Sequence, residues 1–82
     1  MYYIVYNSIT YANRVKSMLE NTKGFAGVVH TPKKIAFGGC SYSLKTNEDK
    51  FRLAVRLSRE LGIKIKGAYK ELDNGEFTEV VI

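Results

Sequence analysis

Hydrophobic residues recur along this chain with the periods of strands and helices, and the first quarter predicts one of each. Tyr2 to Tyr6 is a β-branched and aromatic run typical of a strand, and Asn7-Ser8 after it is a helix-capping signal. From residue 9 or 10 to about residue 21 the apolar positions recur at helical spacing, which predicts an amphipathic helix. Its apolar stripe is expected to consist of Tyr11, Val15, Met18 and Leu19, and Gly24 is expected to end the helical segment.

Two further strands are predicted in the middle of the chain. Phe25 to His30 has strand composition, and Pro32 forbids a continued ladder because it lacks an amide hydrogen. Ser41 to Lys45 alternates polar and apolar residues, the pattern of a strand with one buried face. Residues 31–39 fit neither period and are expected to form a connection between these strands.

A second helix is predicted after Asn47, a good capping residue. Glu48 and Asp49 follow in its first turn, where negative charge suits the helix dipole. Its apolar stripe is expected to contain Phe51, Ala54, Val55, Leu57, Ser58 and Leu61, with Gly62 as the stop. The basic residues on its expected solvated face, which could dock an acidic partner, are Lys50, Arg52, Arg56 and Arg59.

The chain ends in a predicted hairpin. A strand is expected from Ile63 towards Leu72, Asp73-Asn74-Gly75-Glu76 is a tight-turn signal, and Phe77 to Ile82 is expected to return as an added strand. The element order is strand, helix, strand, strand, helix, strand, followed by this C-terminal β-hairpin strand. Such an order predicts an α+β fold of the ferredoxin-like βαββαβ type, in which an antiparallel sheet carries both helices on one face.

Composition narrows the class of protein. The 82 residues suffice for one domain, and the hydrophobic and charged fractions of 45% and 26% are those of a globular chain. One cysteine excludes an internal disulfide, and we recognise neither a signal peptide nor an apolar stretch that would span a membrane. We therefore expect a cytoplasmic protein whose thiol stays reduced and that has no membrane partner. The net charge of +5 would attract polyanions or an acidic protein, without specifying which.

The single cysteine, Cys40, is the strong nucleophile that a local environment could most readily tune near neutral pH. Gly38 and Gly39 directly before it could offer backbone amides to an anion, and the charges of Lys33 and Lys34 would favour a thiolate. The alternative is that Cys40 is a small core residue, as free cysteines often are. Its expected place, where a loop enters the third strand, favours the functional interpretation.

Four segments carry a further signal: Met1-Tyr2-Tyr3-Ile4-Val5-Tyr6-Asn7-Ser8, Thr31-Pro32-Lys33-Lys34-Ile35, the cysteine that follows, and Gly67-Ala68-Tyr69-Lys70. Together they resemble a small bacterial family of selenium/sulfur carrier-like proteins. The resemblance covers roughly residues 1–70 of the single domain 1–82, and residues 71–82 look like a C-terminal strand extension. Ser41 stands where the resemblance leads us to expect a glycine.

The resemblance implies a carrier rather than an enzyme with turnover, holding sulfur or selenium as a persulfide and passing it from a donor protein to an acceptor protein. Carried over, the thiol is Cys40 and the basic step is Lys33 and Lys34. The backbone amides around Gly38 and Gly39, which are not part of the resemblance, could also stabilise the anion. This chemistry requires no metal and no cofactor. A lone cysteine suits it, because a second one would resolve the persulfide into a disulfide. The strand 77–82 could also pair across a homodimer.

Two other function classes stay open from the sequence. One is an RNA-binding module of RRM-like topology, because Tyr3-Ile4-Val5-Tyr6-Asn7-Ser8 is similar to a first-strand recognition signature and Phe37-Gly38 with Tyr42 is weakly similar to the third-strand one. Gly39 stands where a stacking aromatic is needed, so we do not expect nucleic acid as the partner. The other is a small-molecule-sensing regulatory domain. His30 is expected at a strand end, within reach of Cys40 if the loop folds back, and one histidine with one cysteine does not make a zinc site.

Overall fold

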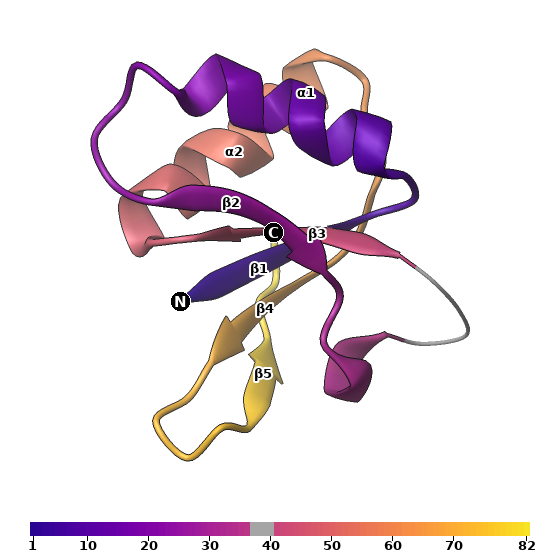
Figure 1. The fold of residues 1–82 in the computed structure, drawn as a ribbon, viewed down its shortest axis with the longest axis vertical. Helices are drawn as coiled ribbons and strands as arrows, with labels where there is room; N and C mark the ends of the chain where they lie inside the picture. The colour runs from indigo at the N-terminus through magenta and orange to yellow at the C-terminus, as the bar shows by residue number, and fades with distance from the viewer. Residues whose placement is uncertain (37–40) are drawn as a thin grey trace.

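The computed structural model describes residues 1–36 and 41–82 and has the predicted α+β architecture. Its elements are β1 (Tyr2–Tyr6), α1 (Ile9–Leu19), β2 (Ala26–His30), the short 3₁₀ helix η1 (Lys33–Ile35), β3 (Tyr42–Thr46), α2 (Glu48–Glu60), β4 (Ile65–Glu71) and β5 (Phe77–Glu79). The strands form one sheet in the order β2-β3-β1-β4-β5, and every neighbouring pair is antiparallel. Both helices lie on one side of this sheet (Figure 1). The ferredoxin-like fold with an added strand is therefore confirmed.

Local signals in the sequence set the helix boundaries. The side chains of Ser8 and Asn47 cap α1 and α2 by accepting hydrogen bonds from the third backbone amide that follows each of them. Helix α2 ends at Glu60, and Gly62 adopts the left-handed conformation (φ 71°) that glycine accepts without steric cost. Helix α1 ends earlier than predicted, at Leu19, and residues 20–25 form the connection to β2.

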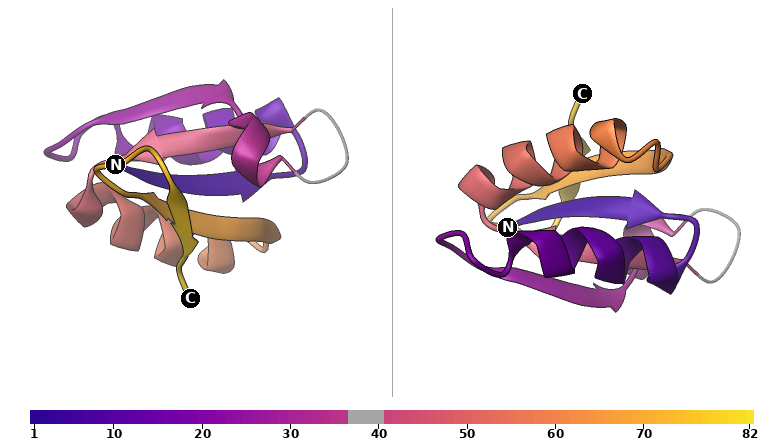
Figure 2. Two further views of the ribbon diagram at one scale, coloured as in Figure 1. Left: turned by 90° about the horizontal axis from the view of Figure 1, so that it is seen from below. Right: turned by 90° about the horizontal axis from the view of Figure 1, so that it is seen from above.

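The main core lies between the helices and the sheet. The helices contact each other and face the strands (Figure 2). They contribute Val15, Leu19, Phe51 and Val55 as buried residues and Leu61 as a half-buried one, as predicted. Tyr11 and Met18 were expected in the same stripe, but they are 43% and 46% exposed. That prediction is wrong because the buried face of α1 is centred on Ala12, Val15 and Leu19, and Tyr11 and Met18 lie to one side of this line.

A second, smaller core covers the sheet face opposite the helices, which we call the outer face. It contains Tyr3, Val5 and Ile35, with Val29, Tyr69 and Phe77 packed against them. Helix η1 and strand β5 supply Ile35 and Phe77, and both elements lie on the side of the sheet away from α1 and α2 (Figures 1 and 2). Strand β1 is thus buried on both faces, which explains its continuous apolar run.

Three expectations about burial and length require correction. Strand β3 was predicted to have one buried face, but Ser43 and Leu44, on opposite faces, are both fully buried because η1 covers the outer face. Lys50 was predicted on the solvated face of α2, but it is 5% exposed because it lies one turn before Ala54 on the inner face. Strand β5 was predicted to extend to Ile82, but it ends at Glu79, followed by one further backbone bond from the Val80 amide to the Ala68 carbonyl (2.8 Å), and Val81 is almost fully exposed.

Candidate functional site

Buried hydroxyls hold together the two strands from which the segment containing Cys40 emerges. The Thr31 amide donates to the Ser41 carbonyl (3.1 Å), and the Ser41 hydroxyl donates to the Thr31 hydroxyl (2.9 Å). The Thr31 hydroxyl is also hydrogen-bonded to that of Ser43 (2.7 Å), and all three residues are buried. Ser41, which replaces the expected glycine, therefore helps to satisfy a buried polar cluster. These hydrogen bonds hold the residue after β2 and the residue before β3 next to each other.

Helix η1 lies directly after β2 and leads into the segment that contains Cys40. The Ile35 amide donates to the Pro32 carbonyl (3.0 Å), and the Ile35 side chain is buried in the outer-face core. The two lysines of this helix are both exposed but differ in their contacts. The Lys34 ammonium binds the Glu76 carboxylate at 3.0 Å and the Gly75 carbonyl at 3.3 Å. Lys33 makes no ion pair with any residue that the structure describes.

The remaining predicted site residues, Gly38, Gly39 and Cys40, lie outside the described residues. Their assignment as a carrier thiol with anion-stabilising amides stays a prediction. The structure does place the predicted lysines and the residue that follows the cysteine. Lys34 and Ser41 each line a cavity that Ile35 also lines.

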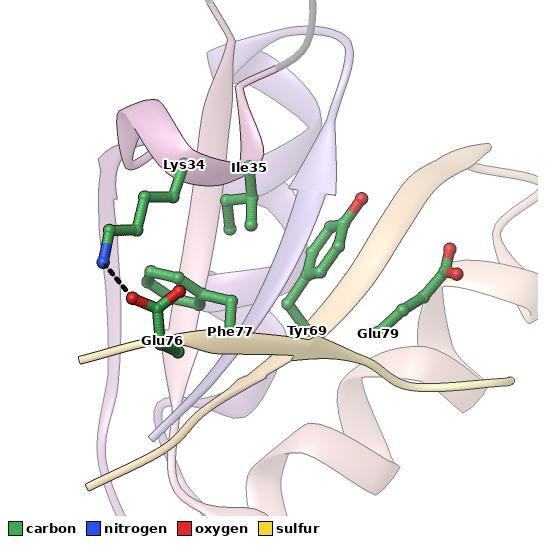
Figure 3. Close-up of a pocket in the computed structure, with 6 residues that line it drawn as sticks. All are labelled: Lys34, Ile35, Tyr69, Glu76, Phe77 and Glu79. Carbon is green, nitrogen blue, oxygen red and sulfur yellow. Dashed lines mark hydrogen bonds and ion pairs between the residues drawn. The ribbon is translucent and has the colours of Figure 1, made fainter. Parts of the chain in front are cut away.

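The larger of these cavities is a surface hollow of about 560 Å³ between η1 and the C-terminal hairpin, which we call the hairpin hollow. Its lining residues are Lys34, Ile35, Tyr69, Glu76, Phe77 and Glu79 (Figure 3). A smaller cavity of about 40 Å³ adjoins it through Ile35 and Tyr69, and is also lined by Val5, Ser41, Lys66 and Gly67. Together the two cavities extend from the hairpin to Ser41, the residue directly after Cys40 in the sequence.

The aromatic lining of the hairpin hollow is held in place by the sheet beneath it. A Cβ added to Gly67 would lie 2.9 Å from the Tyr69 ring, so this ring lies over the bare backbone of the glycine. The Phe77 ring packs edge-on against Tyr3, with ring centroids 5.4 Å apart and an interplanar angle of 75°. Tyr69, Glu76, Phe77 and Glu79 were not predicted as site residues from the sequence. The glycine two positions before Tyr69 on the same strand face was the available signal.

The arrangement of aromatic residues does not form the platform that an RNA-recognition motif uses. Tyr3 lies on the outer face and is buried under neighbouring side chains. Tyr42 pairs with Tyr6 in the β1–β3 ladder, and Tyr6 faces α2, where it bonds to Ser58. Tyr3 and Tyr42 are therefore on opposite faces of the sheet and cannot stack successive bases together. His30 ends β2, as predicted, with its ring 4.7 Å from that of Tyr42.

The described part of the chain contains neither a cluster of metal-binding side chains nor a membrane-spanning helix. Within residues 1–36 and 41–82, no three His, Cys, Asp or Glu side chains come together to hold a metal ion. Neither helix in the described part of the chain is long and apolar enough to cross a membrane.

Comparison with known proteins identifies one similarity. The model of the family described as "Putative Se/S carrier protein-like" matches residues 1–70. No curated protein and no solved structure matches the chain. The match ends at β4, so Lys34, Ile35 and Tyr69 of the hairpin hollow lie inside it and Glu76, Phe77 and Glu79 lie beyond it.

Proposed function

Since the chain belongs to this selenium/sulfur carrier-like family, we propose that it holds one sulfur or selenium atom on Cys40 and passes it from a donor protein to an acceptor protein. The observation that carries the proposal is that the matched residues 1–70 contain the chain's single cysteine. Thiol-borne cargo therefore has one possible position in this protein. We propose a cytoplasmic location, because an unpaired thiol stays reduced there.

The transfer is a thiol–persulfide exchange. The Cys40 thiolate attacks the terminal sulfur of the donor persulfide, the donor S–S bond breaks, and the donor leaves as a thiolate. Delivery reverses the roles: the acceptor thiolate attacks the terminal sulfur on Cys40, and Cys40 leaves as a thiolate. Each step forms one S–S or S–Se bond and breaks one, so no external oxidant or reductant is required. The absence of a second cysteine leaves nothing within the chain to resolve the persulfide.

The surroundings of the cysteine segment support this role. The hydroxyl cluster of Thr31, Ser41 and Ser43 and the buried Ile35 anchor the chain on both sides of residues 36–40. The two lysines of η1 then contribute unequally. The charge of Lys34 is matched by Glu76, whereas Lys33 is free of ion pairs among the described residues. We propose Lys33 as the main cation that favours the thiolate and attracts an anionic persulfide.

The test is intact-mass spectrometry after incubation with glutathione persulfide in the absence of reductant. The wild-type chain should gain the mass of one sulfur atom, and Cys40→Ser should gain nothing. Added thiol acceptor should return the wild-type chain to its original mass. Sulfur gain by Cys40→Ser, no gain by the wild type, or gain of a whole glutathione instead of sulfur would contradict the carrier function.

A homodimer through the C-terminal strand stays a prediction. Strand β5 is the outermost strand on its side of the sheet, and it is paired on one side only, with β4. Its unpaired side could therefore accept a second copy. Light scattering on the wild type and on a chain truncated after residue 76 would show whether β5 is the contact.

A further inference from the structure

The charges of this protein are divided sharply along the chain. All 13 basic residues and four of the eight acidic residues precede residue 71, so residues 1–70 carry a formal charge of +9. The last twelve residues carry a charge of −4, from Glu71, Asp73, Glu76 and Glu79. Residues 71–82, which form the turn and the returning strand of the C-terminal hairpin, are therefore an acidic segment on a basic domain. Complementary charge makes it a place where a basic group would be attracted although the protein as a whole is basic.

The hairpin hollow concentrates this contrast at one place. Its floor is apolar and aromatic, with Ile35, Tyr69 and Phe77 held by the packing already described. Figure 3 shows Lys34 and Glu76 joined on one side and Glu79 beyond Tyr69 on the other. Glu79 is exposed and makes no ion pair with any residue in ranges 1–36 and 41–82. Because Lys34 is matched by Glu76, the charge without a partner among the residues that line the hollow itself is the negative charge of Glu79, and Lys66 lines only the adjoining smaller cavity.

We propose that the hairpin hollow docks an exposed segment of a partner protein that presents an aromatic side chain beside a lysine or arginine. The aromatic ring packs on Ile35, Tyr69 and Phe77, and the basic group pairs with Glu79. Aromatic anchors in preformed, rigid hollows contribute most to protein–protein affinity, because little side-chain freedom is lost on binding.

The position of the hollow suggests which partner docks there. Ile35 and Ser41, which line the two adjoining cavities, precede and follow the segment 36–40. This part of the inference rests on the proposed function: the docked protein is a donor or an acceptor of the cargo on Cys40. Half of the lining residues lie in residues 71–82, outside the family match, so this segment adds selectivity that residues 1–70 do not supply.

The experiment is an NMR titration of the Cys40→Ser chain, which removes thiol chemistry, with three blocked peptides. The probe is acetyl-Gly-Lys-Phe-Lys-Gly-amide, and its controls replace both lysines by glutamate or the phenylalanine by alanine. The basic aromatic peptide should shift the amide signals of Ile35, Tyr69, Phe77 and Glu79. Loss of the aromatic ring should weaken binding about tenfold. Glu79→Gln should weaken it about two- to fivefold, whereas Glu20→Gln, an exposed change directly after α1, should leave it unchanged.

The experiments can refute the docking proposal and the carrier function independently of each other. Equal binding of the acidic peptide, shifts centred outside the hollow, or no saturable shift while the wild-type chain still gains sulfur would overturn the docking proposal alone. Peptide binding at the hollow in a chain whose wild type gains no sulfur would overturn the carrier function and leave the docking site in place.

Discussion

A buried hydrogen-bond chain between the sheet and α2 gives the sharpest test of the core. The Tyr6 side chain is fully buried, and its hydroxyl lies 2.7 Å from that of Ser58. The Ser58 hydroxyl donates to the Ala54 carbonyl at 2.8 Å, so the Tyr6 hydroxyl is the donor to Ser58. Removing the Ser58 hydroxyl and removing the Tyr6 hydroxyl should therefore change the free energy of unfolding by different amounts.

Ser58→Ala leaves the buried Tyr6 hydroxyl without an acceptor, which should lower the free energy of unfolding by about 1–3 kcal/mol. Tyr6→Phe leaves Ser58 still bonded to Ala54, so its cost should be smaller, about 0.5–1.5 kcal/mol. The double variant should be less destabilised than the sum of the two, because the orphaned hydroxyl is then absent. Urea denaturation measures all three values, and thermal unfolding should shift by about 4–8 °C per kcal/mol. A cost of Tyr6→Phe above that of Ser58→Ala, or strict additivity, would refute this hydrogen-bond assignment.

The same residue makes stability depend on alkaline pH. Burial raises the pKa of Tyr6 to about 12 from its ordinary value of 10.0, against the opposing effect of the Ser58 hydrogen bond. The folded state therefore holds this proton more tightly than the unfolded state. The resulting stabilisation is fully present below pH 10 and is lost as the pH rises towards 12, about 3 kcal/mol in total. Denaturation midpoints measured between pH 9 and 12 should fall less steeply for Tyr6→Phe than for the wild type; parallel curves would contradict this reasoning.

Three further results are expected. Leu19→Ala should cost about 2–5 kcal/mol in urea denaturation because the side chain is fully buried, whereas Met18→Ala beside it, half-exposed, should cost less than about 0.5 kcal/mol. Lys33→Gln should slow the alkylation of Cys40 by iodoacetamide near neutral pH, since a cation near the thiol favours the thiolate. The control Lys23→Gln, which lies before the opposite end of β2, should leave the alkylation rate unchanged. Equal rates for the wild type and Lys33→Gln would contradict the role of Lys33. Filter binding should show only weak, salt-sensitive RNA association; submicromolar affinity at physiological salt would contradict our reading of the sheet faces.

The sequence by itself determined the five strands, the two long helices and their order, but not the short helix η1 or the early end of β5. Capping by Ser8 and Asn47 and the stop near Gly62 involve residues at most a few positions apart, so they are readable without the fold. The hydrophobic periods then leave the ferredoxin-like arrangement as the natural way to bury two helical stripes on one sheet. Cys40 could be singled out because it is unique in the chain, and the family could be named from segments within residues 1–70.

Only the tertiary structure decided what covers the outer face of the sheet, and with it the site. Lys34 and Glu76 are 42 positions apart, and the Lys34 contact exists because η1 and the hairpin both pack on Tyr3 and its neighbours. The burial of Ser43 follows from the same covering, although its side chain points where the alternation predicted solvent. The spacing of hydrophobic residues indicates that one face of a strand or helix is apolar, but it does not indicate which distant segment of the chain packs on that face. The hairpin hollow and the neutralisation of Lys34 are products of that long-range packing.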